Sequence, residues 1–346
     1  MDRRQLLKAG LAWPFAFADT ALAKDPIYIG DMHFHSFFGD SKYHSRPLAP
    51  ALAAGNATLV AWSLGGDILW FDTKTYKQKV EPRPGEPLGW FQRELDRIKA
   101  HVAEQKLKVV RTASDVDRAL RGDPHIVLAV EGANFIENDA GRLQLAYNLG
   151  LRHIQLVHYT RNTLGDFQTE PPEHHGLTEL GKRVVRECNR LGILIDLAHC
   201  TEATAREALT ISRAPVVWSH GSVTRGPQAA PSAQVWRRRQ LSLDIAREIA
   251  RKGGVVGLWA LAQDVGKTAE SYGDRLTQLA EWIGEDHVAF GTDLNGLASF
   301  ATVSSYAEVR RVVEHWQRQG LLEARIRKLA IGNYARVVKD ALRSRA

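Results

Sequence analysis

Short apolar or β-branched runs alternate along the chain with longer stretches whose apolar residues recur at the period of an amphipathic helix. Short apolar runs of this kind, bounded by glycine, proline and polar residues, are typical of buried strands. We therefore predict eight strands, at 26–34, 57–64, 125–132, 151–159, 192–199, 214–220, 253–261 and 287–294.

Helical patterns lie between or after these runs. They cover 89–105, 141–150, 177–192, 201–212, 241–254 and 272–284, with two more near 305–318 and 321–343. Thr178 and Ser242 stand where helix N-caps are expected. Glycines that can end a helix in a left-handed conformation follow four of the patterns, at Gly150, Gly192, Gly253 and Gly284.

Strands that regularly alternate with helices are typical of a (β/α)₈ barrel, also called a TIM barrel. A doubly wound open sheet also alternates, but it usually carries a glycine-rich phosphate turn after its first strand, and here that turn reads "MHFHSFFGDS". We predict one barrel domain over residues 24–346. The longest irregular stretches, 71–88, 161–176 and 221–241, all follow strands, so we expect them over the carboxyl-terminal face.

The first 23 residues have a different character. "MDRRQLLKAGLAWPFAFADTALA" contains Arg3 and Arg4, a short and weakly apolar stretch, and small residues at Ala21 and Ala23. This layout is typical of a signal peptide for the twin-arginine export machinery, with an A-x-A cleavage site. The expected location is therefore the periplasm or the exterior, although a basic N-terminus with an amphipathic turn is the alternative.

The composition narrows the possible classes of protein but does not indicate a function. The chain has 346 residues, 44% of them hydrophobic, and a formal net charge of +7. No apolar run approaches the roughly 20 residues that span a bilayer. The short basic cluster "WRRRQ" lacks interleaved aromatic residues, so we expect no nucleic-acid partner. Two cysteines, Cys188 and Cys200, allow at most one internal disulfide.

Potential metal ligands stand at the ends of the predicted strands. In a (β/α)₈ barrel these ends meet at one rim, where active sites form. The residues are His33, His35, Glu131, His158, His199, His220 and Asp293. Singly, each has a structural alternative, since a strand-end histidine can cap a loop, a buried glutamate can pair with arginine, and an aspartate can cap a helix. Their joint placement predicts a binuclear metal site.

These residue types fit hydrolytic metal chemistry. Neutral imidazole and carboxylate groups suit zinc and similar divalent ions. A carboxylate such as Glu131 can bridge two ions about 3.5–4 Å apart, and a water shared by them becomes a hydroxide nucleophile near neutral pH. Asp293 could take up that proton and pass it to the leaving amine.

The stretch from 176 to 222, "GLTELGKRVVRECNRLGILIDLAHCTEATAREALTISRAPVVWSHGS", resembles the membrane (renal-type) dipeptidases, zinc enzymes of the amidohydrolase superfamily. "AVEGANF", "LVHYTRNTLGDF" and "HVAFGTDLNG" are similar to further segments of that family. The resemblance implies Glu131 as the bridging ligand, His199 and His220 on one ion, and His33, residue 35 and Asp293 on the other. It implies that His158 orients the scissile carbonyl and stabilises the oxyanion.

Three departures from the family pattern concern the site. The family usually has His-x-Asp on the first strand, whereas this chain has His33-Phe34-His35, which removes one negative charge. The substrate-carboxylate arginine of the family aligns with Arg239, but about eight extra residues intervene, so Arg225 and Arg238 stay open as alternatives, as does a solvated basic loop. Asn295 replaces the usual second aspartate of its segment.

The predicted function is hydrolysis of dipeptides by a hydroxide bridging two divalent metal ions, with zinc as the expected metal. The alternative is another amidohydrolase reaction, on an N-acyl amino acid, lactone or related small amide or ester. A third hypothesis, a binding or scaffold protein on an inactive barrel, would show lost ligands, yet every ligand position holds a competent residue. The preferred dipeptide and the oligomeric state, a homodimer included, stay open.

Overall fold

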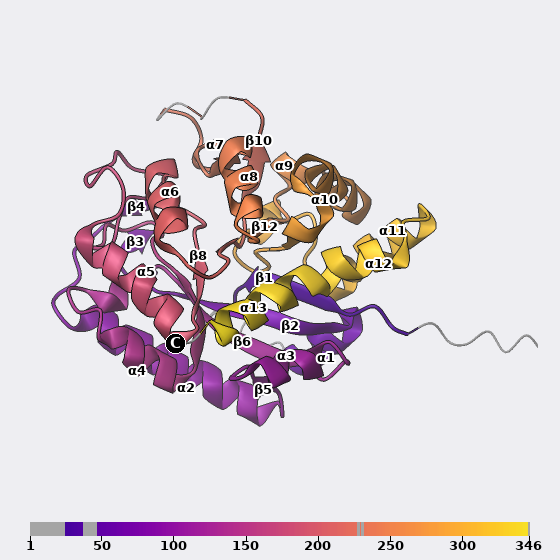
Figure 1. Ribbon diagram of the computed structural model, residues 1–346, viewed down its shortest axis with the longest axis horizontal. Coiled ribbons are helices and arrows are strands. Elements are labelled where there is room, and N and C mark those ends of the chain that lie inside the picture. The colour runs from indigo at the N-terminus through magenta and orange to yellow at the C-terminus, as the bar shows by residue number, and fades with distance from the viewer. Residues whose placement is uncertain (1–24, 37–46, 227–228, 230–231, 345–346) are drawn as a thin grey trace, which may run out of the picture.

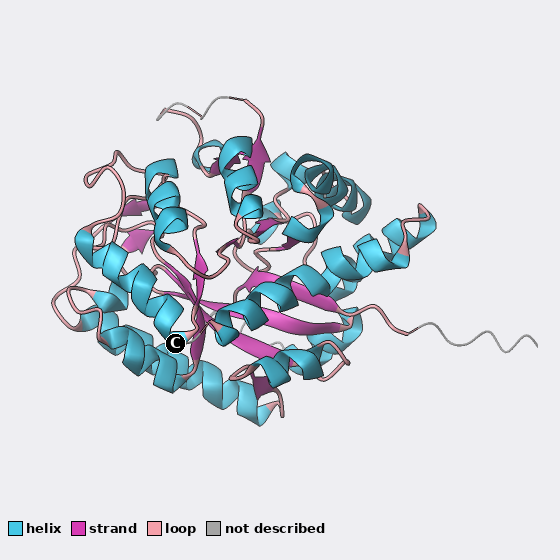
Figure 2. Cartoon of the chain, in the orientation of Figure 1, coloured by secondary structure: helices cyan, strands magenta, loops and turns pink. Residues whose placement is uncertain are grey.

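A computed structural model describes residues 25–36, 47–226, 229 and 232–344. The predicted signal peptide therefore lies outside the described residues. Within them, eight parallel strands close into a barrel surrounded by helices, as predicted (Figures 1 and 2). The strands are β1 (Ile29–Phe34), β2 (Ala57–Gly65), β6 (His125–Glu131), β7 (Leu151–Gln155), β8 (Leu194–Asp196), β9 (Val217–Trp218), β12 (Val255–Leu258) and β13 (Val288–Phe290).

The barrel closes because each strand pairs in parallel with both of its neighbours. The order runs β1-β2-β6-β7-β8-β9-β12-β13 and returns to β1 through the pairing of Asp31 with Phe290. The longest ladder joins β2 to β6, from Leu59–His125 to Gly65–Glu131. A ninth short strand, β5 (Lys108–Val109), pairs with the start of β6. Parallel order places the carboxyl ends of all eight barrel strands on one face.

Helices follow the strands and cover the outside of the barrel. They are α1 (Leu48–Gly55), α2 (Glu86–Glu104), α3 (Ala113–Ala119), α4 (Arg142–Leu149), α5 (Glu179–Leu191), α6 (Glu202–Ile211), α7 (Val235–Arg238), α8 (Leu243–Arg251), α9 (Ala262–Val265), α10 (Ala269–Ile283), α11 (Tyr306–Arg318), α12 (Glu323–Arg327) and α13 (Asn333–Arg343). Short 3₁₀ turns, η1 (Asn134–Ile136), η2 (Glu285–His287) and η3 (Ala298–Phe300), lie between them. The described residues contain no helix that is both long and apolar enough to cross a bilayer.

The predicted caps are found where the pattern placed them. The Thr178 side chain accepts from the Gly181 backbone N–H at the start of α5, and Ser242 does the same from Ile245 in α8. Gly192 ends α5 with φ 77°, a left-handed conformation that favours glycine. The helix predicted over 321–343 is divided instead into α12, a π-helical turn η4 (Lys328–Gly332) and α13.

Several strands end earlier than the sequence predicts. The run 151–159 is a strand only to Gln155, and 192–199 only to Asp196. Asp196 explains the second case, because its carboxylate accepts the backbone N–H groups of Ala198 and Ser219 at 2.9 Å each. The chain therefore leaves the ladder before His158 and His199, and both histidines lie on the loops just beyond the strands.

The irregular stretches contain small elements of their own. β3 (Phe71–Asp72) and β4 (Lys77–Gln78) form a hairpin after β2, and β10 (Ser222–Thr224) pairs with β11 (Gln240–Ser242) after β9. At the opposite end, α13 packs its buried face, which includes Tyr334, against Met32 of β1 in one apolar cluster. One end of the barrel is thus filled by apolar side chains, and the loops after the strands lie at the other.

Candidate metal centre

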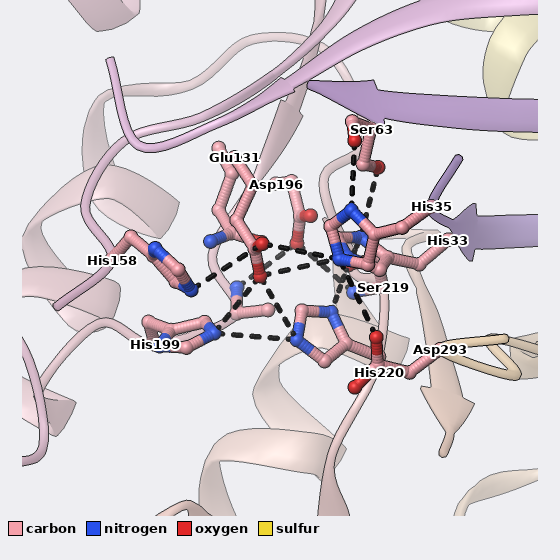
Figure 3. A network of polar contacts seen from close by, with 12 residues as sticks. His33, His35, Ser63, Glu131, His158, Asp196, His199, Ser219, His220 and Asp293 are labelled. Atoms are coloured by element: carbon pink, nitrogen blue, oxygen red, sulfur yellow. Dashed lines mark hydrogen bonds and ion pairs between the residues drawn. The ribbon is translucent and has the colours of Figure 1, made fainter. Parts of the chain in front are cut away.

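The barrel brings the seven predicted rim residues into one buried cluster, which Figure 3 shows from close by. Glu131 is the last residue of β6, and His33 lies in β1. The others follow strand ends within three residues: His35 after β1, His158 after β7, His199 after β8, His220 after β9 and Asp293 after β13. Each is 8% exposed or less, so the cluster is almost closed to bulk water.

Glu131 lies at the centre of the cluster. Its Oε1 is 3.1 Å from His199 Nε2, 3.3 Å from His220 Nε2 and 3.5 Å from His33 Nε2. Its Oε2 is 3.3 Å from Nε2 of both His35 and His158. Each oxygen thus faces several imidazoles, and members of both ligand sets, His199 and His220 on one side and His35 on the other, lie beside different oxygens, as a carboxylate shared by two ions allows.

Two sets of three residues offer ligand atoms within 4.8 Å of one another: His33, His35 and Asp293, and Glu131, His199 and His220. A third set joins Asp196 to His33 and His220. However, Asp196 already accepts two backbone N–H groups through Oδ1, and its Oδ2 lies 3.4 Å from His153 Nε2. The first two sets agree with the ligand groups that the sequence resemblance implies.

The donor chemistry of the first set fits a cation. His35 Nδ1 lies 2.8 Å from the Ser63 carbonyl oxygen, which can only accept, so this nitrogen carries a proton. In neutral His35 the lone pair is therefore on Nε2, which faces Glu131 and lies 3.1 Å from His33 Nε2. A lone pair directed at a carboxylate is repelled by it unless a positive charge lies between them.

The pKa values of the clustered residues are shifted by burial and by one another. Burial raises the pKa of Glu131, but the neighbouring imidazoles outweigh this and hold it well below its usual range. Burial lowers the pKa of His199 well below its usual range, and the charge of Arg239 acts in the same direction. Burial also acts to lower the pKa of His35, but the hydrogen bond to Glu131 and the charge of that carboxylate raise it to about 9.

His158 is held by a second buried carboxylate, that of Asp67. Asp67 Oδ1 lies 2.6 Å from His158 Nδ1, while Oδ2 accepts from the backbone N–H groups of Tyr159 and Thr160 at 3.0 and 2.9 Å. Three contacts through one carboxylate fix both the ring and the loop that carries it. His158 Nε2 is thereby directed at Glu131 and the centre of the cluster.

The three candidate substrate arginines differ in where they lie relative to the cluster. Arg239 is only 2% exposed, and its Nη2 lies 3.2 Å from His220 Nε2. Its other partners are Tyr159 Oη and Gln168 Oε1, both at 3.3 Å, and no described carboxylate lies within 4.0 Å of its guanidinium. Arg225 is exposed and lies over the Trp282 ring, away from the cluster. Arg238 donates to the Thr169 carbonyl.

Two of the cluster residues adopt a conformation that non-glycine residues rarely adopt. His199 has φ 69° and Asp293 has φ 55°. Backbone hydrogen bonds maintain both turns, from Gln168 to the His199 carbonyl at 2.8 Å and from Asp293 to the His33 carbonyl at 2.9 Å. Such strain, of order 1–3 kcal/mol per residue, is typical of functional sites, where surrounding structure stabilises it.

A comparison with protein families matches residues 68–346 to the membrane dipeptidase family, Peptidase family M19. The chain belongs to this family. The prediction made from residues 176–222 is thereby confirmed. The first strand, with its His-x-His pattern, lies before the matched residues.

Curated relatives include two fungal dipeptidases. Dipeptidase verJ of Clonostachys rogersoniana is 30% identical over 67% of this chain, and dipeptidase tcpJ of Claviceps purpurea is 28% identical over 71%. The matches span 60% and 58% of the length of these two relatives. Among solved structures, a Rhodobacter sphaeroides metallo peptidase liganded with a phosphinate mimic of L-Ala-D-Ala superposes with a TM-score of 0.75. The identity is 23%, over 92% of this chain and 100% of the other.

Sequence reasoning missed the residues that orient the ligands. Ser63 Oγ lies 3.0 Å from His33 Nδ1, Ser219 Oγ lies 2.9 Å from His220 Nδ1, and Asp67 contacts His158. Asp67 follows the end of β2 and could have been found by extending the search for strand-end acids to the second strand. The serines could not, because serine is a common residue with no distinguishing signal: Ser63 acts on a histidine of another strand, and Ser219 on the histidine that follows it.

Proposed function

We propose that the chain is a metal-dependent dipeptidase that acts on free dipeptides at the cluster around Glu131. The observation that carries the proposal is the arrangement of five imidazole nitrogens within 3.5 Å of the two Glu131 oxygens, beside the buried cation of Arg239. Membership of a dipeptidase family supports the same reaction.

Two divalent ions, with zinc as the expected metal, fit these donors. His33, His35 and Asp293 would hold one, His199 and His220 the other, and Glu131 would bridge them. When bound, such ions act as Lewis acids and lower the pKa of a water to near neutrality.

The chain's own residues would bind and orient the substrate. Arg239 is a buried cation without a carboxylate partner among the described residues, so the α-carboxylate of a dipeptide is the counter-ion we expect for it. His158, fixed through Asp67, would face the scissile carbonyl with Nε2, from which the imidazolium form can donate a hydrogen bond. Burial raises the pKa of Asp293, which suits a carboxylate that takes up a proton and returns it to the leaving amine.

A second candidate keeps the same machinery and changes the substrate. An N-acyl amino acid offers the same carboxylate to Arg239 and a similar amide to the cluster, but no free amino group. His35 in place of the usual aspartate favours this candidate, because a site with one less negative charge attracts a free ammonium group less strongly.

The test combines metal analysis with a substrate panel. We expect purified protein to hold close to two divalent ions and to hydrolyse L-L or L-D dipeptides. The variant Arg239→Gln should lower kcat/KM by about 10- to 100-fold, because hydrogen bonds to charged groups contribute about 1.5–3 kcal/mol. Arg83→Gln, at an exposed surface ion pair with Glu86, is the matched control. Turnover of N-acyl substrates alone would favour the second candidate, and a metal-free protein would favour a binding role.

We also propose that the chain is exported to the periplasm or beyond by the twin-arginine route. The paired Arg3 and Arg4, the weakly apolar stretch and the A-x-A sequence ending at Ala23 support this. The route carries folded proteins, so a cytoplasmic metal-loading step is compatible with it.

A further inference from the structure

A second cleft, of about 580 Å³, lies beside the metal centre but outside it. It is bounded by β10, α7, α9 and α10, which lie near one another in the orange part of Figure 1. A volume of this size is typical of small-molecule sites. None of the seven clustered rim residues lines it.

The charge of this cleft is strongly positive. Arg225, Arg237 and Arg275 line it, and no described carboxylate lies within 4.0 Å of any of the three guanidinium groups. Asp264 is the one acidic residue among the described lining residues. Its Oδ2 accepts from the Trp259 indole N–H at 2.5 Å and its Oδ1 from the Gln240 amide at 3.3 Å, so both oxygens are engaged in the wall.

Some arginines on neighbouring helices do have carboxylate partners. Arg318 lies 3.6 Å from Glu270 on another part of α10, and Arg206 pairs with Glu248 of α8. The feature that distinguishes the three arginines of the cleft is therefore that they line one hollow together, with no described carboxylate within 4.0 Å.

Two indoles hold the arginine side chains in place. The guanidinium carbons of Arg275 and Arg225 lie 4.7 and 5.5 Å from the centre of the Trp282 ring, and that of Arg237 lies 5.0 Å from Trp236. Cation–π contacts at this range hold an arginine while leaving its N–H donors available. Arg275 is further positioned by donating to the Val223 carbonyl at 2.6 Å and to Gln278 Oε1 at 3.0 Å, so part of its donor set is already in use. Two like charges beside one ring make this part of the cleft attractive to an anion.

The cleft shares a wall with the candidate substrate arginine. The Trp259 ring that donates to Asp264 also lies 5.3 Å from the Arg239 guanidinium carbon. Gln240 lines the cleft and is the residue after Arg239, and its carbonyl accepts from Gln168, a partner of Arg239. A ligand in the cleft would therefore contact the same wall that positions Arg239.

We propose that this cleft binds a small molecule with a carboxylate or phosphate group, held by Arg225, Arg237 and Arg275, with its apolar part against Trp236 and Trp282. The assignment does not depend on the reaction at the metal centre. Guanidinium groups bind both kinds of anion through paired N–H donors, so the same three arginines could hold either a carboxylate or a phosphate group.

The test is a titration of the metal-loaded full chain with inorganic phosphate and, separately, with succinate. Binding is followed by calorimetry and tryptophan fluorescence at constant ionic strength. The key variant is Arg225→Gln/Arg237→Gln, since both side chains are exposed and contact indole rings at the edge of the cleft rather than the core. Arg83→Gln controls for the loss of a surface charge, and metal content and thermal melting check that each variant stays folded.

We expect saturable binding with a fluorescence change, weakened at least tenfold in the double variant and unchanged in Arg83→Gln. Saturation by phosphate alone assigns a phosphoryl ligand, and by succinate alone a carboxylate ligand. Saturation by neither, or equal affinity in the wild type and the double variant, overturns the proposal. Equal affinity in the wild type and the double variant would place the anion at the metal centre instead. Loss of dipeptide hydrolysis is a separate measurement and leaves this result unaffected.

Discussion

Glu131 and His35 together show how much positive charge the cluster requires. The Glu131 carboxylate faces five imidazoles, and the His35 lone pair faces that carboxylate and, at 3.5 Å, Asp293 Oδ1. His35 is therefore either protonated or coordinated to a metal. An aspartate at the same position would supply an anionic ligand, so the departure at residue 35 changes the charge of the site while keeping a donor there.

We predict that His35→Asp keeps two metal ions per chain, whereas His35→Ala loses about one of them. Aspartate supplies a carboxylate donor at this position, but alanine leaves His33 and Asp293 as the remaining unshared ligands of that ion. Metal content after gel filtration, measured by mass spectrometry, gives the result. Equal content in the alanine variant and the wild type would show that His35 is not a ligand.

Asp67 gives a second prediction at this scale. Asp67→Asn should lower kcat by about 10- to 100-fold while metal content stays unchanged, because the change disturbs a group that orients His158 rather than a ligand. The amide would also alter which His158 nitrogen carries the proton. Steady-state kinetics with a dipeptide and metal analysis test this. A loss of metal in the variant, or an unchanged kcat, would contradict the positioning role.

The residues at the rim could be predicted because ligand chemistry is visible in residue type, and a parallel barrel gathers strand ends. The choice among arginines could not. In "WRRRQ" three adjacent arginines look alike, and only the short helix α7 and the turn after it place Arg239 in the cluster and Arg237 in the cleft. Asp67 and His158 are 91 residues apart, so their contact depends on the closed barrel.

At the scale of elements, close approach between strands shapes the site. A Cβ atom on Gly291, just after β13, would lie 1.6 Å from the Ser219 carbonyl oxygen and 3.4 Å from the Gly257 Cα. Ser219 precedes His220, so the narrow packing of β9, β12 and β13 sets where this histidine lies. Strand boundaries were harder to predict than strand positions, because turns such as that at Asp196 depend on side chains that accept backbone N–H groups.

We predict that Gly291→Ala destabilises the protein by about 1–3 kcal/mol, since the backbone of Ser219 has to move to admit the methyl group. Gly89→Ala in α2 is the matched control. Its Cβ would meet only the end of the Arg93 side chain, at 3.2 Å, so the helix should gain up to about 1 kcal/mol. Chemical denaturation of both variants measures the difference, and equal stabilities would contradict the packing argument.

The loop after β7 supplies a prediction with a pH dependence. Asp166 accepts the backbone N–H groups of Glu173, His174 and Gly176 at 2.8, 3.0 and 3.0 Å. Burial acts to raise its pKa, but these bonds outweigh burial and hold the pKa below its usual value. Asp166→Asn should therefore cost about 1–3 kcal/mol of stability near neutral pH.

The sign of the pH effect follows from the depressed pKa. The ionised carboxylate stabilises the folded state above its unfolded pKa of about 4, and this contribution is lost as the pH falls through the lower folded value. The stability gap between the wild type and Asp166→Asn should narrow below about pH 4. Denaturation curves from pH 3 to 7 measure it, and a gap that stays constant would assign the effect to shape rather than charge.

At the scale of the whole molecule, the barrel separates stability from chemistry. The apolar cluster of α13 and the strand starts lies at one end, and the titratable residues of the metal centre lie at the other. The cationic cleft lies next to that centre. The overall fold could be predicted because the alternation of strands and helices extends over the chain, whereas the cleft could not, since its arginines are spread from 225 to 275.

Export is a property of the whole chain for which the sequence provides the evidence. Replacing Arg3 and Arg4 with lysine should keep the protein in the cytoplasm of a twin-arginine-competent bacterium, because this route reads the arginine pair rather than its charge. Lys8→Arg is the matched control, as it makes the same kind of exchange outside the pair. Cell fractionation with immunoblotting measures the location, and N-terminal sequencing of the exported form should begin near Lys24. Equal export of the double-lysine variant and the wild type would refute the twin-arginine assignment.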